Sequence, residues 1–187
     1  QFSEEEILEP TDWVLMNFIM DARTGLGRFR DFKISNYQLM MKLIDACKDH
    51  SIEEILEMED VAERVALYHE HNELAKVQLA KCATVHKNLV VLDLTEEETI
   101  YATNRFVIYA MYSDCNISIH KMWGLKKQNV VFAIGKSITN RSSNTNVGEL
   151  CLKYGGGGHL NAGTCQVETS RAEAVLDEII DTITSDG

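Results

Sequence analysis

Four consecutive glycines at positions 155–158, followed directly by His159, constrain this chain more than any other stretch of it. Glycine offers little side-chain surface to bury and loses the most conformational entropy on folding, so packing explains such a run poorly. A backbone without Cβ atoms can instead approach a ligand closely and point several N–H groups into an anion-binding nest. His159 adds a side-chain N–H donor. Because structured sequence flanks the run, a flexible hinge is disfavoured and a phosphate-binding site is predicted.

The glycines match neither of the common nucleotide-binding loops. No Gly-Lys-Ser/Thr follows them, and they lie between a predicted helix and a predicted strand rather than between a first strand and its helix. A second polar segment, residues 135–144, follows an apolar stretch and contains Arg141 and Ser142. The arginine fork and the hydroxyl suit phosphate oxygens, so we expect both residues to contact phosphate. An exposed polar loop is the alternative interpretation of this segment.

Composition excludes several classes of function. A chain of 187 residues with 45% hydrophobic content can bury one good core or two small ones. Its net charge of −11 argues against broad binding to long nucleic acids, although a short nucleotide in a local pocket remains compatible. Five scattered cysteines without a CxxC pair are typical of free thiols in a reducing compartment. No apolar run reaches the ~18 residues of a membrane span, so we expect a cytoplasmic protein without membrane contact.

Local patterns predict both helices and strands. Capping-box spacing marks helix starts at Ser3, Ser35 and Ser51, and the nearly all-apolar residues 13–20 favour a buried helix. Apolar residues at three- and four-residue steps predict a long helix over residues 59–87. Further helices are expected to start after Thr95, Asn146 and Ser170. Strands rich in Val, Ile and aromatic residues are expected at residues 89–94, 106–112, 116–122, 130–134 and 164–167.

The segment from 135 to 167 resembles the C-terminal DHHA1 domain of the DHH phosphoesterases. The pattern of that domain is a polar Arg-Ser stretch, a short helix and then Gly-Gly-Gly-His-x-x-Ala-Gly. Arg141-Ser142, a helix expected at 147–154 and residues 156–163 match it, with Asn161 where the family usually carries alanine. The resemblance implies that this domain holds the phosphate or base of a small nucleotide. The implied phosphate-binding residues are Arg141, Ser142, Gly156, Gly157, Gly158 and His159.

In outline the resemblance covers the whole chain. It implies an α/β fold in which a mixed-sheet DHHA1 domain with flanking helices (88–187) follows a helical remnant of the DHH catalytic domain (1–58) and a long linker helix (59–87). Catalysis in this family uses a two-Mn²⁺ centre. The Asp-His-His triplet of that centre is absent from the sequence, but residues 20–30 look like the last DHH motif. Asp21 would then ligate a metal, although an insertion at residues 22–23 departs from the pattern; otherwise Asp21 merely caps a loop.

The resemblance implies that the full-length protein is a Mn²⁺-dependent phosphoesterase acting on short RNA or DNA oligonucleotides or on small phosphorylated nucleotides. The chain starts at Gln1 without a methionine and is expected to be a piece of that protein. One aspartate cannot hold two ions about 3.5–4 Å apart, so this piece alone should bind substrate weakly and hydrolyse nothing. The alternatives are a non-catalytic nucleotide- or RNA-end-binding module, an exopolyphosphatase-like hydrolase, and a domain that serves mainly to form a homodimer.

Two histidine features stay outside the predicted site. His69 and His71 point to different sides of a helix, so their stretch favours a solvated helix face over a metal site. His120 lies on an alternating strand and faces either a binding cleft or solvent, and we assign it no role.

Overall fold

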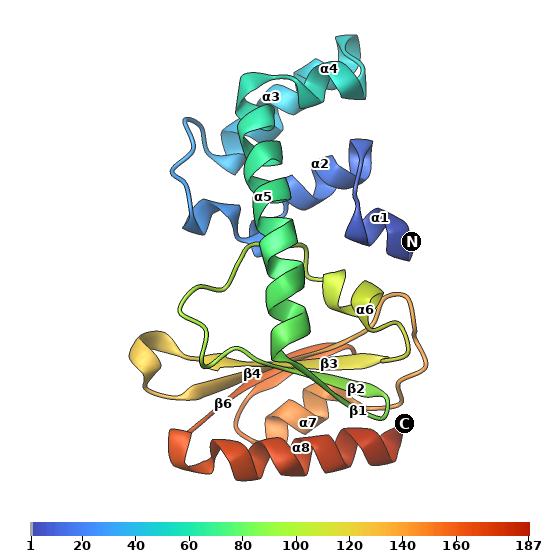
Figure 1. Cartoon of the computed structure of the whole chain (residues 1–187), viewed down its shortest axis with the longest axis vertical. Coiled ribbons are helices and arrows are strands. Elements are labelled where there is room, and N and C mark those ends of the chain that lie inside the picture. The colour runs from blue at the N-terminus through green and yellow to red at the C-terminus, as the bar shows by residue number, and fades with distance from the viewer. Residues whose placement is uncertain (1) are drawn as a thin grey trace. The chain divides into compact units, whose positions relative to one another are not determined.

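The structure is a computed structural model that describes residues 2–187 and divides into two compact units. The helical unit comprises Phe2–Gln78 and Tyr101–Val107, and the sheet unit comprises Leu79–Ile100 and Ile108–Gly187. Helices make up the first, while a mixed sheet with flanking helices makes up the second (Figure 1). The expected α/β fold class is therefore confirmed.

The helical unit is built from helices whose starts are encoded locally. Ser3, Ser35 and Ser51 each cap a helix, and in each case the residue three positions later returns a side-chain bond to the cap backbone. All three predicted capping boxes are confirmed. The elements are α1 Glu4–Leu8, α2 Asp12–Met20, the 3₁₀ turns η1 Ala22–Thr24 and η2 Leu26–Arg28, α3 Asn36–Asp49, α4 Ile52–Leu56 and α5 Glu59–Cys82, whose last turn enters the sheet unit.

Aromatic rings and one buried amide hold the core of the helical unit. Phe18 of α2 and Tyr68 of α5 stack with their ring centroids 6.5 Å apart. Asn104 donates from Nδ2 to the Tyr68 hydroxyl oxygen at 2.8 Å and to the carbonyl of Ile7 at 3.0 Å. Burial raises the pKa of Tyr68 to about 12, so the ring stays neutral. These contacts bind α1, α2 and α5 to the segment that contains Asn104.

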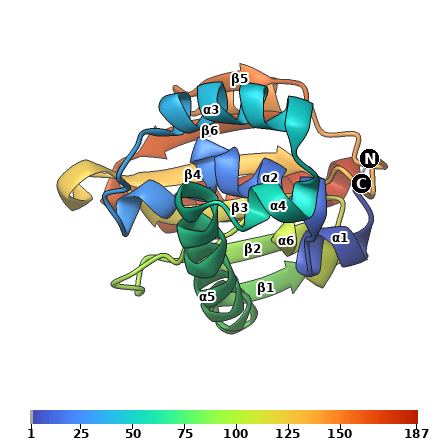
Figure 2. The ribbon, with the colours of Figure 1, turned by 90° about the horizontal axis from the view of Figure 1, so that it is seen from above.

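The sheet unit carries six strands in the order β1-β2-β3-β4-β6-β5, which Figure 2 follows from β1 to β5. Only β2 and β3 pair in parallel among the described strands, so the sheet is mixed. The elements are β1 Ala83–His86, β2 Leu89–Asp93, α6 Val107–Met111, β3 Ile117–Trp123, η3 Leu125–Lys127, β4 Val130–Lys136, α7 Val147–Lys153, β5 Gly157–His159, β6 Ala162–Val167, η4 Thr169–Arg171 and α8 Ala172–Asp186.

Helices α7 and α8 cover one face of this sheet (Figure 1). Ile119 and Phe132 of the sheet are buried with Leu150 of α7 and Ile179 of α8 in one apolar core. Since side chains alternate along a strand, Ser118 and His120 point to the opposite face. There the Tyr109 hydroxyl of α6 lies 2.9 Å from Ser118 Oγ and donates to the carbonyl of Gly135 at 2.7 Å.

Residues 106–112 correct one strand prediction, because they contain helix α6 instead. A short apolar run fits a buried strand and a buried helix equally well by periodicity. Just before the helix, the side chain of Asn104 accepts a hydrogen bond from the backbone N–H of Phe106 at 3.1 Å. That bond turns the chain into the helix and decides between the two structures.

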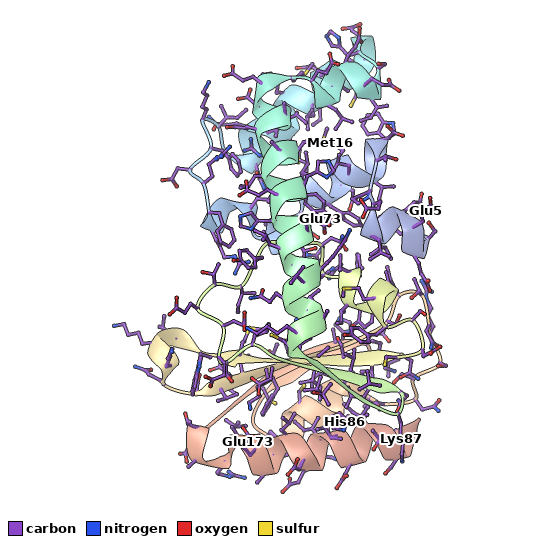
Figure 3. All side chains as sticks on the ribbon, in the orientation of Figure 1. Glu5, Met16, Glu73, His86, Lys87 and Glu173 are labelled. Carbon is purple, nitrogen blue, oxygen red and sulfur yellow. The ribbon has the colours of Figure 1, made fainter. Side chains whose placement is uncertain are left out.

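The long helix also ends earlier than predicted. α5 stops at Cys82 instead of residue 87, and Ala83–His86 pair with β2 as strand β1. The turn between β1 and β2 places Lys87 in the left-handed region at φ 53°, next to His86 (Figure 3). β-branched Thr84 and Val85 favour the extended conformation, which explains why the helical pattern does not continue.

Two predicted helix caps are wrong, and in each one side chain of the expected capping pair has another partner. Thr95 donates its hydroxyl Oγ1 to Asp93 Oδ1 at 2.5 Å, and residues 95–98 form turns without a helix. Ser170 lies inside η4, and α8 begins at Ala172 with no side-chain cap. Glu173, the expected capping partner, instead accepts a bond from Lys121 at 2.5 Å.

The expected division at residues 58 and 87 stays a prediction. Within residues 2–187, none of the helices combines the length and the apolar character that crossing a lipid bilayer requires.

Candidate functional site

The glycine run forms one arm of a β-hairpin at the edge of the sheet. β5 pairs with β6 in antiparallel register, with Gly157 opposite Thr164 and His159 opposite Ala162. Leu160 and Asn161 form the turn. The sequence analysis did not foresee this strand, because glycine is a poor strand former in isolation.

Close backbone packing explains two of the four glycines. A Cβ atom on Gly156 would lie 2.0 Å from the carbonyl oxygen of Thr164, and one on Gly158 would lie 2.3 Å from that of Ala162. Gly155 adopts φ +76°, whereas Gly157 has nothing within 4 Å of its hypothetical Cβ. The expectation that packing does not account for the run is therefore wrong at Gly156 and Gly158.

Part of the expected anion nest is used inside the protein. The N–H of Gly155 donates to the carbonyl of Leu152 at 3.1 Å, and the N–H of Gly156 donates to that of Cys151 at 3.0 Å. Both bonds satisfy carbonyls at the end of α7, which would otherwise lack partners. The N–H groups of Gly155 and Gly156 thus terminate helix α7. A ligand can therefore contact only Gly157 and Gly158 of the run.

His159 is exposed, and its orientation suits donation to a ligand. Its Nδ1 accepts the backbone N–H of Asn161 at 3.2 Å, so a neutral ring carries its proton on Nε2. The carbonyl of Asn161 in turn accepts the N–H of Lys136 at 2.9 Å. The residue that departs from the family pattern, Asn161, therefore fixes the histidine through its backbone.

Gly157, Gly158 and His159 line one shallow pocket of about 280 Å³. Asn146, Gly148 and Leu152 of the α7 region complete it together with Glu149. The carboxylate of Glu149 repels an anion inside this pocket. The pocket alone is consequently a poorer phosphate site than the motif indicates, and a further cation is needed beside His159.

Arg141 and Ser142 lie on the loop after β4, outside that pocket. Both are exposed, and Arg141 donates from Nε to the carbonyl of Ile138 at 3.2 Å. The Ser142 hydroxyl donates to Asn140 Oδ1 at 2.7 Å and accepts from Asn116 Nδ2 at 3.0 Å. The guanidinium keeps further N–H groups for a ligand, whereas the serine proton is committed to the loop.

The loop and the hairpin nevertheless meet at one end of the sheet. Gly135 at the end of β4 pairs with Ala162, which also pairs with His159 on the other side. The bond from Lys136 to Asn161 ties the start of the loop to the hairpin turn. The predicted phosphate residues therefore share one edge, although they do not share one pocket, and their contact with phosphate stays a prediction.

Asp21 of the helical unit forms the N-cap of η1 and is engaged by a neighbour. It accepts the backbone N–H of Arg23 at 2.9 Å and the guanidinium at Nε and Nη2, each at 2.8 Å. The side-chain bonds from Arg23 hold the pKa of Asp21 below its usual range, against the opposing effect of burial. Asp21 thus caps a loop, as one interpretation expected, and it stays ionised.

A metal centre built from the described residues alone does not fit. Nowhere in residues 2–187 do three or more His, Cys, Asp or Glu side chains come together in a group that could hold an ion. The assignment of Asp21 as one ligand of a Mn²⁺ pair stays a prediction.

The histidine stretch on α5 corrects another expectation. His69 is exposed, but His71 is buried rather than solvated. Its Nδ1 accepts the backbone N–H of Ala102 at 3.1 Å, and its ring centroid lies 4.1 Å from that of Phe29. Burial lowers the pKa of His71, so this side chain serves the helical core as a neutral acceptor.

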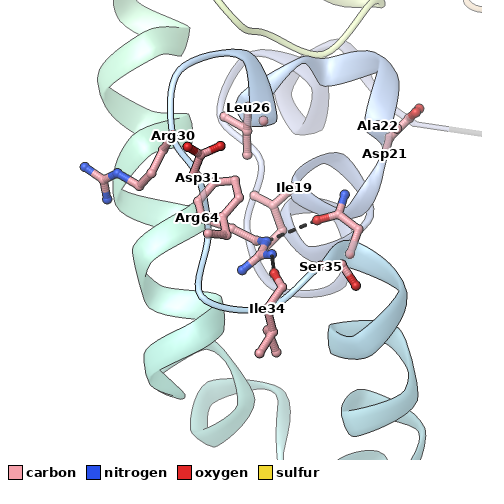
Figure 4. A pocket seen from close by; sticks show the side chains of 12 residues that line it. Ile19, Asp21, Ala22, Leu26, Arg30, Asp31, Ile34, Ser35 and Arg64 are labelled. Atoms are coloured by element: carbon pink, nitrogen blue, oxygen red, sulfur yellow. Dashed lines mark hydrogen bonds between the residues drawn. The ribbon is translucent and has the colours of Figure 1, made fainter.

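A second pocket, of about 340 Å³, escaped the sequence analysis (Figure 4). It lies in the helical unit, where the fully buried Arg64 stands among apolar and polar side chains. On α5 this arginine resembles any helix-surface charge, so no local signal marks it. The pocket is lined by Ile19, Asp21, Ala22, Leu26, Gly27, Arg30, Asp31, Phe32, Ile34, Ser35, Asn36 and Arg64.

The fold and the Gly-Gly-Gly-His-x-x-Ala-Gly hairpin are those of a DHH/DHHA1-type phosphoesterase. A comparison with solved structures confirms the resemblance that the motifs indicated. The whole chain superimposes on a pGpG-specific phosphodiesterase, PggH, from Vibrio cholerae with a TM-score of 0.97 and 62% sequence identity. The chain spans 64% of the length of that protein.

A more distant structure shares the fold only. An exopolyphosphatase-related protein from Bacteroides fragilis matches 80% of the chain with 17% identity and a TM-score of 0.52, and the match covers 43% of that protein. No family model matches the chain, and no curated protein matches it.

Proposed function

We propose that this chain is part of a metal-dependent phosphodiesterase that hydrolyses short 5′-phosphorylated oligonucleotides, with the linear dinucleotide pGpG as its substrate. One observation carries the proposal. The chain is 62% identical, over its entire length, to a phosphodiesterase described as specific for pGpG, with almost the same backbone. At this identity the residues that line a site are expected to be largely shared.

The residues of the sheet unit would bind and orient the substrate. His159 offers Nε2–H, and Arg141 offers the planar fork that matches phosphate oxygens. Arg141 would also supply the further cation that a phosphate needs beside His159. Ser142 would act by holding the loop that carries Arg141. Fixing the terminal phosphate in this way aligns the scissile bond and supplies much of the rate by positioning.

Asp21 would hold one of two Mn²⁺ ions together with ligands outside this chain, and such a pair would supply the activation of water. It follows that the 187-residue chain alone should bind pGpG weakly and leave it intact.

The test uses the protein in the full length that its gene encodes, with Mn²⁺ and pGpG, and follows release of GMP by chromatography. We expect turnover that His159→Ala and Arg141→Ala each lower by about tenfold or more, the loss of one charge-assisted hydrogen bond. Arg171→Ala is the matched control, because Arg171 is an exposed arginine after β6, at the other end of the sheet.

Three outcomes separate the alternatives. Turnover of pGpG that falls in both variants and not in the control supports the proposal. Tight binding of pGpG without turnover would favour the non-catalytic binding module. Release of inorganic phosphate from polyphosphate, with no action on pGpG, would favour the exopolyphosphatase-like hydrolase and overturn the proposal.

A further inference from the structure

We propose that the pocket around Arg64 in the helical unit binds a guanine base of the substrate. This inference rests on the proposed function for the identity of the substrate. It adds a base-recognition site that is separate from the phosphate contacts at the hairpin. The site is a cavity of about 340 Å³, which is within the usual range for small-molecule pockets.

Arg64 makes the floor of this pocket rigid. Its guanidinium donates to the carbonyl of Asp60 and to that of Ile34, each at 2.7 Å. A third bond runs from Nε to Asn36 Oδ1 at 3.3 Å. Figure 4 draws the bond from Arg64 to Ile34 as a dashed line. Because these partners hold the guanidinium in place, Arg64 keeps the pocket in one shape even when no ligand is bound.

The bond to Arg64 also orients Asn36. Its Oδ1 is taken by the guanidinium, so the amide nitrogen Nδ2 remains as the donor group of that side chain. The ring of Phe32 lies against Arg64, with 4.0 Å between the guanidinium carbon and the ring centroid. Ile19 and Leu26 add apolar walls. An aromatic ring, a fixed amide donor and apolar walls suit a flat, partly polar ligand.

The charges around Asp31 in this pocket favour a neutral ligand. The carboxylate of Asp21 is already paired with Arg23, and the buried Arg64 is paired with Glu63 at 3.3 Å. On the rim, Arg30 and Asp31 carry opposite charges, and neither side chain has a hydrogen bond or ion pair within residues 2–187. Apart from Asp21, which the proposed function assigns to the metal centre, the site thus offers the carboxylate of Asp31 as an acceptor with balanced surroundings, which suits a neutral base.

Asp31 distinguishes guanine from the other bases. Guanine presents two adjacent donors, N1–H and the N2 amino group, which match both oxygens of one carboxylate, and its O6 accepts from a donor such as Asn36 Nδ2. Adenine carries an acceptor at N1 in place of N1–H, so one oxygen of the carboxylate would face a lone pair. We therefore expect guanine nucleotides to bind here at least about tenfold more tightly than adenine nucleotides.

The test observes the pocket directly. Isotope-labelled chain is titrated with GMP and, separately, with AMP, and NMR follows the side-chain N–H signals of Arg64 and Asn36. We expect GMP to shift both signals with saturation and AMP to shift them at least about tenfold less effectively. Asp31→Asn should remove the preference for GMP. Asp49→Asn is the control, since Asp49 is an exposed aspartate of α3 that does not line the pocket.

The outcomes separate this inference from the proposed function. GMP that leaves both signals unmoved, or AMP that moves them equally, overturns the guanine pocket even if the full-length protein cleaves pGpG. A GMP-specific shift that Asp31→Asn removes supports the pocket even if pGpG is not cleaved, in which case the proposed function alone fails. Because Asp31 is exposed, the variant should fold, and an unchanged spectrum elsewhere verifies it.

Discussion

The glycine-histidine hairpin and the Arg64 pocket owe their shapes to opposite features of the sequence. The hairpin is shaped by missing side chains, because Gly156 and Gly158 let one strand and its neighbour approach as bare backbone. The pocket is shaped by one large charged side chain, which three backbone and side-chain acceptors hold in place. The glycine run can be recognised in the sequence, whereas the burial of Arg64 cannot.

Two buried titratable groups, one from each unit, also differ in how they are accommodated. Burial lowers the pKa of Arg64, but Glu63 and Asp60 oppose it and the guanidinium stays charged. Burial lowers the pKa of His120, in the sheet unit, to about 4, so that ring stays neutral. Hydrogen bonds surround the guanidinium of Arg64, so its charge is tolerated inside the protein. The ring of His120 lacks such compensation within residues 2–187 and therefore stays neutral. Each of the following changes tests one side of this comparison.

Gly156→Ala should have the largest effect, because it attacks the hairpin at its closest approach. The new Cβ would lie 2.0 Å from the Thr164 carbonyl oxygen, so β5 and β6 must separate. We expect the free energy of unfolding to fall by about 3 kcal/mol, at the upper end for overpacking. Urea unfolding followed by circular dichroism measures the change.

Gly157→Ala is the matched control for that experiment. Nothing lies within 4 Å of its Cβ position, so the free energy of unfolding should change by less than about 1 kcal/mol. Equal losses in both variants would contradict the packing explanation and return the whole run to a role in flexibility or binding.

Acid should act next most strongly, through His120. The folded state keeps this ring neutral down to about pH 4, whereas the unfolded chain binds a proton near pH 6.5. The stabilisation is therefore complete above pH 6.5 and is lost as the pH falls toward 4, by about 3 kcal/mol. Urea unfolding at intervals between pH 7 and 4.5 measures this slope.

His120→Gln separates this histidine from the other titrating groups. The variant cannot bind the proton at position 120, so its free energy of unfolding should vary less with pH over the same range, and the remaining slope should come from His71, whose pKa burial also lowers. Carboxylates with lowered pKa values, such as that of Asp21, remain ionised across that range and contribute little. An identical slope in the variant and the natural protein would show that His120 is not the group responsible.

What the sequence predicted correctly was decided by neighbours in the chain. The capping boxes at Ser3, Ser35 and Ser51 need only residues three positions away, and all three formed. Prediction failed where another partner, near or far in the sequence, took the side chain. Thr95 bonds to Asp93, and Glu173 is taken by Lys121, which is far from it in sequence, so neither makes the helix cap that its spacing indicated.

The candidate sites also differ in whether local sequence was enough to find them. The sequence located the glycine run, because glycine has few reasons to recur four times, but the hairpin and the packing of Gly156 on Thr164 required the sheet register. The second pocket could not be found, because Arg64 meets Ile34 from thirty positions away. His71 was assigned to solvent for the same reason, since its partner Ala102 comes from a separate segment.

Arg64→Lys should cost less than either change above, because it keeps the charge of the pocket and removes only its fork. A lysine amine cannot reach the carbonyls of Asp60 and Ile34 and the side chain of Asn36 together. We expect a loss of about 2 kcal/mol in the free energy of unfolding, from buried acceptors left without donors. Arg30→Lys, at an exposed position on the rim, should change it by less than about 0.5 kcal/mol.

Ser142→Ala should have the smallest effect and sharpens the account of the hairpin end of the sheet. The hydroxyl bridges Asn116 and Asn140, so its loss should cost about 1 kcal/mol of stability. Since the loop keeps Arg141, the affinity for pGpG, measured calorimetrically without added metal, should weaken by no more than about threefold, against about tenfold for Arg141→Ala. A loss as large as that of Arg141→Ala, at unchanged stability, would mean that Ser142 contacts the phosphate itself. The bond to Asn140 would then have to break on binding, and the hairpin end, like the Arg64 pocket, would depend on side chains rather than on backbone alone.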